Sequence, residues 1–192
     1  MNEDLKYRKA EPADAERIME IIRQAQAQMR ALGSLQWQDG YPARADIDRD
    51  IARGYGYVFE KSDAAENPAA AETPQKYDKG TVPGGVIAYG AAVFDGEPAY
   101  GAIDGAWLTG GDYVVLHRLA VADGEKGRGV AAEFMRRTEA LARGRGVDSF
   151  RVDTNFDNRY MLRMLERLRF AYCGKIIYES GERLAFEKPL EA

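Results

Sequence analysis

The residues best suited to hold an anion lie in GEKGRGVAAEF, residues 124–134, between an apolar run and a helical pattern. Glycine at such a junction lets the backbone approach a ligand closely, and the first N–H groups of a helix attract negative charge. Successive N–H groups from Lys126 to Ala131 would form a concavity for a phosphate. A plain surface turn with solvated charges is the alternative that binds nothing.

Phosphate-binding motifs of two known kinds match this turn only in part. Gly124 and Gly129 have the spacing of a P-loop, but valine and alanine follow where that motif has lysine and a hydroxyl residue. GRGVAA at 127–132 matches the dinucleotide fingerprint, and Asp153 ends the next strand, where a ribose-binding acid would be expected. Only one βαβ unit is predicted, over 112–154, so a dinucleotide-binding enzyme is the less favoured alternative.

A third match is K-G-R-G-V-A at 126–131, which resembles the Q/R-x-x-G-x-G/A motif of the GNAT superfamily of acetyl-CoA-dependent N-acetyltransferases. Three further stretches resemble that superfamily's fourth strand, its fifth strand with a following asparagine, and its next helix: HRLAV (117–121), FRVDTNFDN (150–158) and MLRMLERLRFAYCG (161–174). The order of elements agrees from residue 5 to 188, apart from 62–84. The resemblance implies a mixed α/β fold with a mostly antiparallel central sheet, helices on both faces, and one parallel strand pair that splays apart.

Hydrophobic periodicity predicts where the elements lie. Strands are expected at 5–10, 55–61, 85–94, 112–121 and 148–154, a hairpin over 172–188, and helices over about 15–32, after Pro42, over 129–143 and over 161–168. Asp157 or Asn158 would cap the last helix. Residues 95–110 are predicted to be a turn-rich connection. The segment 62–84, rich in Ala, Pro and Glu, is predicted to be a flexible loop inserted in a single domain of 192 residues.

Composition narrows the classes of function. A net charge of −4 argues against nucleic-acid binding, and a single cysteine cannot form an internal disulfide. One histidine excludes most histidine-based metal sites, so no metal is expected. No apolar run is long enough to span a membrane, and the first residues have no secretory core, so we expect a cytoplasmic protein without a membrane partner.

The resemblance implies acetyl-CoA as cosubstrate and a set of residues that hold it. The freed edge of strand 112–121 would pair with the pantetheine arm, the glycine turn would hold the pyrophosphate, and an asparagine would reach the cofactor. The residues implied are Leu119, Ala120 and Val121 for the arm, Lys126, Gly127, Arg128, Gly129, Val130 and Ala131 for the pyrophosphate, and Asn158.

The implied reaction is direct attack of a primary amine on the acetyl thioester in a ternary complex. The amine must first lose a proton, and His117 is the only side chain whose ordinary pKa is near neutrality. Strand alternation would place His117, Leu119 and Val121 on one face. Leu165 stands where the superfamily often has a proton-donating tyrosine, so Tyr172 and Cys173 are the candidate substitutes.

The acceptor pocket of GNAT folds usually involves the first two helices and their connector. This points to Trp37, Gln38, Asp39 and Tyr41, whose rings and acid could hold a cationic amine, while Asp153 could orient it. The acceptor would be a small-molecule or peptide amine. Because Leu165 replaces the tyrosine, a non-catalytic acyl-CoA-binding module is the alternative. Homodimers are frequent in the superfamily, although no residue here argues for one.

Overall fold

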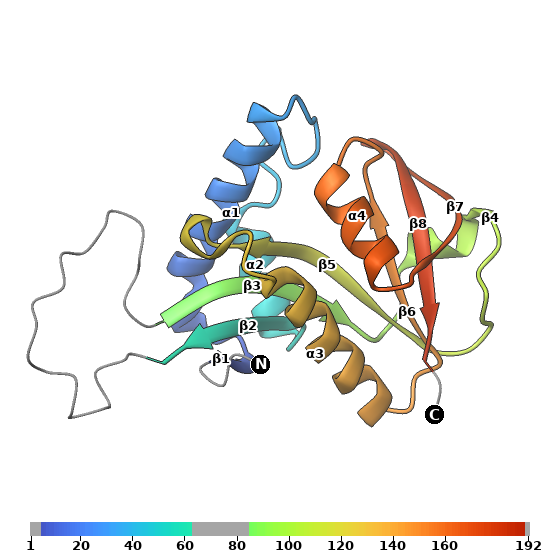
Figure 1. The fold of residues 1–192 in the computed structure, drawn as a ribbon, viewed down its shortest axis with the longest axis horizontal. Helices are drawn as coiled ribbons and strands as arrows, with labels where there is room; N and C mark the ends of the chain where they lie inside the picture. The colour runs from blue at the N-terminus through green and yellow to red at the C-terminus, as the bar shows by residue number, and fades with distance from the viewer. Residues whose placement is uncertain (1–4, 63–84, 191–192) are drawn as a thin grey trace, which may run out of the picture.

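The computed structural model describes residues 5–62 and 85–190, which form one eight-stranded sheet with helices on both faces (Figure 1). The strands are β1 (Leu5–Lys9), β2 (Gly56–Lys61), β3 (Gly85–Val93), β4 (Asp104–Gly105), β5 (Tyr113–Val121), β6 (Ser149–Thr154), β7 (Ala171–Tyr178) and β8 (Gly181–Pro189). The helices are α1 (Ala15–Ala31), α2 (Arg44–Ala52), α3 (Val130–Gly144) and α4 (Arg159–Arg167). The predicted loop at 62–84 lies, apart from its first residue, outside the described residues.

The sheet has the strand order β1-β2-β3-β5-β6-β8-β7-β4, and its only parallel neighbours within the described ranges are β5 and β6. Their pairing runs from Tyr113 opposite Ser149 to Val115 opposite Arg151 and then stops. Beyond this point the two strands diverge, as Figure 1 shows. The predicted mixed fold with a splayed parallel pair is therefore confirmed.

Within the described residues, each face of the sheet is covered by two helices. The apolar stripe of α1, which includes Ile18 and Ile22, packs with Ile47 of α2 against one face. On the other face, Phe134 of α3 and Leu165 of α4 belong to the main core cluster. Both helix pairs therefore bury the periodic apolar positions from which they are predicted. None of the helices in residues 5–62 and 85–190 combines the length and apolar character needed to cross a bilayer.

A β-bulge in β5 overturns the predicted alternation of side chains. Ala91 of β3 lies opposite His117, but Tyr89 lies opposite Ala120, so β5 carries one extra residue. Arg118 takes up the bulge with a φ of 57°, in the left-handed region. Leu119 therefore packs on the α3 side, whereas His117 and Arg118 both face the side of α2 and residues 95–98. The prediction that His117 and Leu119 share a face was wrong because period-2 alternation fails across a bulge.

Two further differences from the predicted elements have clear causes. Residues 95–110 contain the two-residue strand β4, which pairs Gly105 with Gly174 of β7; it is too short to leave a periodic signal. Arg169, which stands where the GNAT pattern has glycine, adopts a φ of 63° directly after α4. The N–H of Arg169 donates to Glu166 O and that of Phe170 to Leu165 O, so the helix ends in a Schellman motif despite the missing glycine.

Candidate functional site

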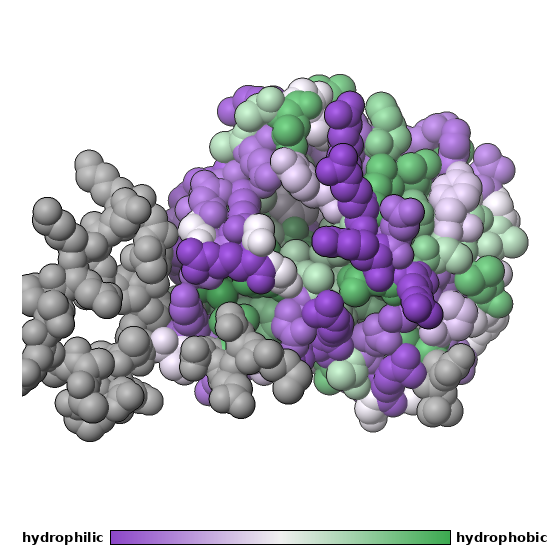
Figure 2. Space-filling view, viewed as in Figure 1, coloured by the Kyte–Doolittle hydropathy of each residue, from purple (hydrophilic) through white to green (hydrophobic). Residues whose placement is uncertain are grey.

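A cleft of about 980 Å³ opens where β5 and β6 diverge. Its floor includes residues 116–119 of β5 and 152–155 at the end of β6. Its walls come from the α1–α2 connector, from residues 95–98, and from the β7–β8 hairpin. Figure 2 shows the surface hollowed between α1 and α4. Three distant segments thus meet over one splayed strand pair, which makes this the candidate site.

The glycine turn at the start of α3 has the geometry of an anion site. Gly127 and Gly129 adopt φ values of 76° and 81°, and among the described residues no atom beyond the two adjacent residues would lie within 4 Å of a Cβ at either position. Within the part of the chain that the structure describes, the backbone N–H groups of residues 127–132 donate to no protein acceptor. Six free donors at a helix N-terminus suit a pyrophosphate. Lys126 is held by Asp123 at 2.5 Å, and Arg128 is exposed near Glu125.

The far end of β6 carries two buried side-chain oxygens without a partner. Thr154 is 1% exposed and Asn155 is 7% exposed, and within residues 5–62 and 85–190 neither Thr154 Oγ1 nor Asn155 Oδ1 has a hydrogen bond. Both residues line the cleft. A buried polar atom without a partner costs free energy, so these oxygens favour a polar ligand lying in the splay. The extended, amide-containing arm of a coenzyme A molecule fits this need.

His117 and Glu97 form a hydrogen-bonded pair in the cleft. Nε2 of His117 lies 3.1 Å from Oε2 of Glu97, and the side chains are 19% and 23% exposed. The hydrogen bond from His117 holds the pKa of Glu97 below its ordinary value, so the carboxylate stays ionised and can only accept. In the neutral imidazole, Nε2 then carries the hydrogen and Nδ1 carries the lone pair. No group in residues 5–62 or 85–190 bonds to Nδ1, so it is free to take a proton.

Asp153 lies in the same cleft with two tyrosine hydroxyls on one of its oxygens. Tyr100 donates to Asp153 Oδ1 at 2.7 Å and Tyr178 donates to the same atom at 3.4 Å. Burial, together with Asp153, raises the pKa of both hydroxyls, so they remain donors. Within the described chain no cation neutralises Asp153, which is half-buried. This carboxylate is therefore suited to bind an ammonium group.

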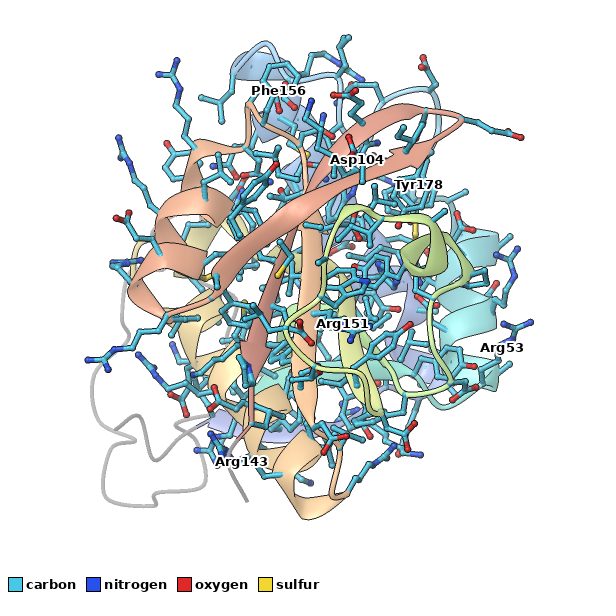
Figure 3. All side chains as sticks on the ribbon, turned by 90° about the vertical axis from the view of Figure 1, so that its right-hand side faces the viewer. Arg53, Asp104, Arg143, Arg151, Phe156 and Tyr178 are labelled. Atoms are coloured by element: carbon cyan, nitrogen blue, oxygen red, sulfur yellow. The ribbon has the colours of Figure 1, made fainter. Side chains whose placement is uncertain are left out.

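A buried network holds the segment that carries Glu97 and Tyr100. Arg151 is 4% exposed and donates to Glu187 Oε1 at 3.0 Å and to Thr109 O at 2.8 Å. Its guanidinium lies 4.4 Å from the centroid of the Trp107 ring, and the indole N–H donates to Tyr100 O. Figure 3 shows Arg151 deep in the molecule, behind this segment. The network fixes residues 97–109 against β6 and so places the acids of the cleft.

A second buried ion pair holds the bulge of β5. Arg118 donates from Nε to Asp50 Oδ2 at 2.8 Å and from Nη2 to Asp50 Oδ1 at 2.6 Å. Asp50 also accepts from Tyr89 Oη at 2.6 Å, and Arg118 reaches Tyr41 Oη at 2.8 Å. The side chains of Asp50 and Arg118 are 5% and 14% exposed. Asp50 thus acts across the sheet face to hold Arg118 in its left-handed conformation.

The α1–α2 connector lies over the cleft and is tied to the β6–α4 turn. Ser34 Oγ donates to Asp157 Oδ1 at 2.9 Å, and Asn158 Nδ2 donates to Gln36 Oε1 at 3.2 Å. Trp37 lines the cleft together with the other predicted acceptor residues Gln38, Asp39 and Tyr41. Trp37 has a φ of 60°, in the left-handed region. Backbone strain of this kind in non-glycine residues gathers at functional sites.

The predicted site residues do not all lie at the cleft. His117, Leu119, Asp153 and Asn158 line it, and Asn158 also caps α4 by accepting from the N–H of Met161. Ala120 and Val121 are buried in the two core clusters, so only their backbones can reach the splay. Tyr172, Cys173 and Leu165 lie outside the lining: Tyr172 is 57% exposed, Cys173 is buried between strands, and Leu165 is in the core. The tyrosines that do line the cleft are Tyr41, Tyr55 and Tyr178.

Glu97, Asp50 and Tyr178 are cleft residues that the sequence analysis missed. Glu97 lies in a predicted turn, and its pairing with His117 spans 20 positions. Asp50 stands on the α2 face that carries Ile47, where an acid in an apolar stripe was the only available signal. The described residues contain no group of three or more histidine, cysteine or acidic side chains placed to hold a metal ion.

Comparisons with known proteins agree with this geometry. The sequence matches the model of the acetyltransferase (GNAT) family over residues 29–170. A GNAT-family acetyltransferase from Streptococcus agalactiae is 32% identical, with 99% of this chain and 98% of that chain covered and a TM-score of 0.79. Two structures are similar in fold alone. The NatC complex bound to Gag peptide and CoA is 14% identical, with 98% and 99% covered and a TM-score of 0.62. The ribosomal-protein-S18-alanine N-acetyltransferase from Escherichia coli is 11% identical, with 98% and 95% covered and a TM-score of 0.58. A search of curated proteins finds no match.

Proposed function

Because this chain belongs to the GNAT acetyltransferase family and is an N-acetyltransferase, we propose that it acetylates a primary amine by direct attack within a ternary complex. The observation that carries this proposal is the cleft over the splayed strands, which is lined both by a histidine with a free nitrogen and by an uncompensated carboxylate. The fold with one parallel strand pair gives no support to a dinucleotide-binding enzyme.

Acetyl-CoA supplies the acetyl group as a thioester, whose carbon–sulfur bond breaks, with the electron pair going to sulfur, as the new carbon–nitrogen bond forms. The thiolate then takes up the second proton, which the acylated nitrogen loses. The free N–H groups of residues 127–132 support a pyrophosphate site there, with Lys126 and Arg128 adding positive charge. The unpaired β5 edge from Leu119 to Val121 and the partnerless oxygens of Thr154 and Asn155 support binding of the pantetheine arm. Asn158 lies beside them in the cleft.

Two groups of the cleft prepare the acceptor. An amine with a pKa of roughly 10 arrives as an ammonium ion, and Asp153 offers it a carboxylate. Nδ1 of His117 then takes one proton, because Nε2–H is bonded to Glu97. The ionised Glu97 stabilises the imidazolium that results. General-base catalysis of this kind contributes about 10²- to 10⁴-fold in rate.

Binding and chemistry can be tested separately. Acetyl-CoA at a hundred times its dissociation constant should stabilise the fold by about 2.7 kcal/mol. Gly129→Glu should abolish that stabilisation. Gly146→Glu is the matched control, since Gly146 has a φ of 69° with open space around it but lies beyond the other end of α3. Normal acetyl-CoA binding by the Gly129 variant would mean that the phosphate site has been misplaced.

The chemical step is tested by CoA release with a panel of amines. His117→Gln should lower kcat by about 10²-fold or more at neutral pH, and the deficit should shrink at high pH, where the amine is already neutral. Stabilisation by acetyl-CoA with no thiol release from any amine would instead favour a non-catalytic acyl-CoA-binding module. Stabilisation by a nicotinamide cofactor would favour the dinucleotide alternative.

A further inference from the structure

Most arginines at the cleft are already engaged or directed elsewhere. Arg118 pairs with Asp50, and Arg49 pairs with Asp46. Arg53 is exposed, and Figure 3 shows its side chain at the edge of the molecule, directed outward. Arg183 of β8 remains. It lines the cleft from the β7–β8 hairpin and, within the described residues, forms no ion pair with a carboxylate.

The surroundings of Arg183 hold its guanidinium without neutralising it. Its Nη1 donates to Glu182 O and its Nη2 donates to Ser180 Oγ, each at 3.1 Å. The nearby carboxylate of Glu182 is taken by Lys175 at 3.0 Å. The Arg183 guanidinium carbon lies 5.9 Å from the centroid of the Tyr178 ring. A partly buried arginine positioned in this way keeps donors that suit a carboxylate.

Tyr178 links this cation to the amine site. Its ring lies under Arg183, while its hydroxyl donates to Asp153 Oδ1. Burial and the charges of Asp153 and Glu97 raise the pKa of the Tyr178 hydroxyl, whereas Arg183 acts in the opposite direction, so all three charges lie close to this one side chain. A carboxylate for an ammonium and a guanidinium for an anion therefore lie against the same tyrosine, Asp153 at its hydroxyl and Arg183 at its ring.

We infer that the acceptor is an amino acid or a similarly short amino carboxylate, with its ammonium on Asp153 and its carboxylate on Arg183. This inference rests on the proposed function and assigns its substrate class. A polyamine or a polycationic antibiotic whose second ammonium lay beside Arg183 would be repelled there. A simple amine would leave the guanidinium without its anion.

The test compares each amino acid with the amine that remains when its carboxylate is removed. Rates of CoA release give kcat/KM for each pair, corrected for the fraction of neutral amine. At least one amino acid should exceed its decarboxylated partner by about tenfold or more. Arg183→Gln should lower kcat/KM for that amino acid by about 10- to 100-fold, mainly through KM, because a charge-assisted pair is lost. The same variant should leave the decarboxylated amine within about twofold of the unmodified enzyme.

Arg53→Gln is the matched control, since it removes the same group from an outward-directed position and should change neither substrate. Stabilisation by acetyl-CoA should persist in both variants. The inference is overturned if the decarboxylated amines, spermidine or phosphoethanolamine are the better acceptors, or if the Arg183 variant keeps the preference for the amino acid. Acetylation of those amines would leave the proposed function standing. If acetyl-CoA binds but nothing in the panel is acetylated, the proposed function fails together with the inference.

Discussion

Replacing Asp50 with alanine is the sharpest test of how the cleft is held in shape. Asp50 accepts two hydrogen bonds from Arg118 and one from Tyr89, and its side chain is 5% exposed. In Asp50→Ala the Arg118 charge stays behind in a site that is 14% exposed, with Tyr41 as its remaining partner. Breaking a buried pair by removing one member costs about 3–5 kcal/mol.

The thermal effect follows from the size of the chain. For 150 to 250 residues, each kcal/mol lowers Tm by about 2–4 °C, so Asp50→Ala should lower Tm by about 6–20 °C. Part of the loss is offset if the bulge rearranges, because Arg118 then escapes a left-handed conformation that costs about 1–2 kcal/mol. A rearranged bulge would displace the β5 edge at the splay. We therefore expect kcat to fall on the order of 100-fold in the variant that remains folded.

The assay is urea unfolding followed by tryptophan fluorescence, together with steady-state acetyl transfer. Tyr89→Phe is the control, since it removes one hydrogen bond to Asp50 and keeps the ion pair; it should cost about 1–2 kcal/mol and leave kcat unchanged. The double variant Asp50→Ala/Arg118→Gly removes both charges and places glycine at the positive φ. It should be more stable than Asp50→Ala alone. This reasoning would be refuted if the unfolding free energy of Asp50→Ala lay within about 1 kcal/mol of that of the unmodified protein. It would also be refuted if the separate effects of Asp50→Ala and Arg118→Gly added up to the effect of the double variant.

Three further outcomes are expected. Arg169→Gly should stabilise the fold by about 0.5–1 kcal/mol in urea unfolding, because glycine adopts the left-handed conformation without strain; a loss of stability would contradict the Schellman assignment. Hydrogen bonds from Arg8 at 2.7 and 2.9 Å hold the pKa of Asp14 below its ordinary 3.8, so its contribution is present above that pH and is lost as pH falls through the lowered value. Asp14→Asn should therefore lower the free energy of unfolding by about 2 kcal/mol at neutral pH and by progressively less in acid. The exposed Asp48→Asn, as control, should lower it much less. A loss of stability in Asp14→Asn that does not change with pH would exclude this linkage. Burial raises the pKa of the Cys173 thiol, which lies outside the cleft lining, so Cys173→Ala should keep kcat/KM within about twofold and lose only slow thiol labelling. A Cys173→Ala variant that is folded but inactive would instead show that Cys173 takes part in catalysis.

Features that depend on neighbouring residues could be predicted from the sequence. The spacing of Ile18, Ile22 and Ala25 predicts a helix from about residue 15 to 32, and α1 spans Ala15–Ala31. The apolar run of β5 and the hairpin of β7 and β8 are also where their patterns place them. Helical and strand periodicities involve only neighbouring residues, so they can be recognised in the sequence without knowledge of long-range contacts. The glycine turn belongs to the same class, because glycine is the residue that adopts the positive φ values found at Gly127 and Gly129 without strain.

Features that depend on register and on long-range pairing were decided by the tertiary structure. Whether β5 has a bulge depends on β3, which offers one residue fewer between Tyr89 and Ala91, and this choice sets the face on which His117 lies. The pair of Glu97 with His117 arises only when residues 95–98 fold back over β5. The same holds for Asp50 with Arg118, which are 68 positions apart. The residue types of the cleft could be read from the chain, but their partners could not, because an ion pair or a catalytic hydrogen bond depends on distances of a few ångströms that only the packed sheet and its connections create.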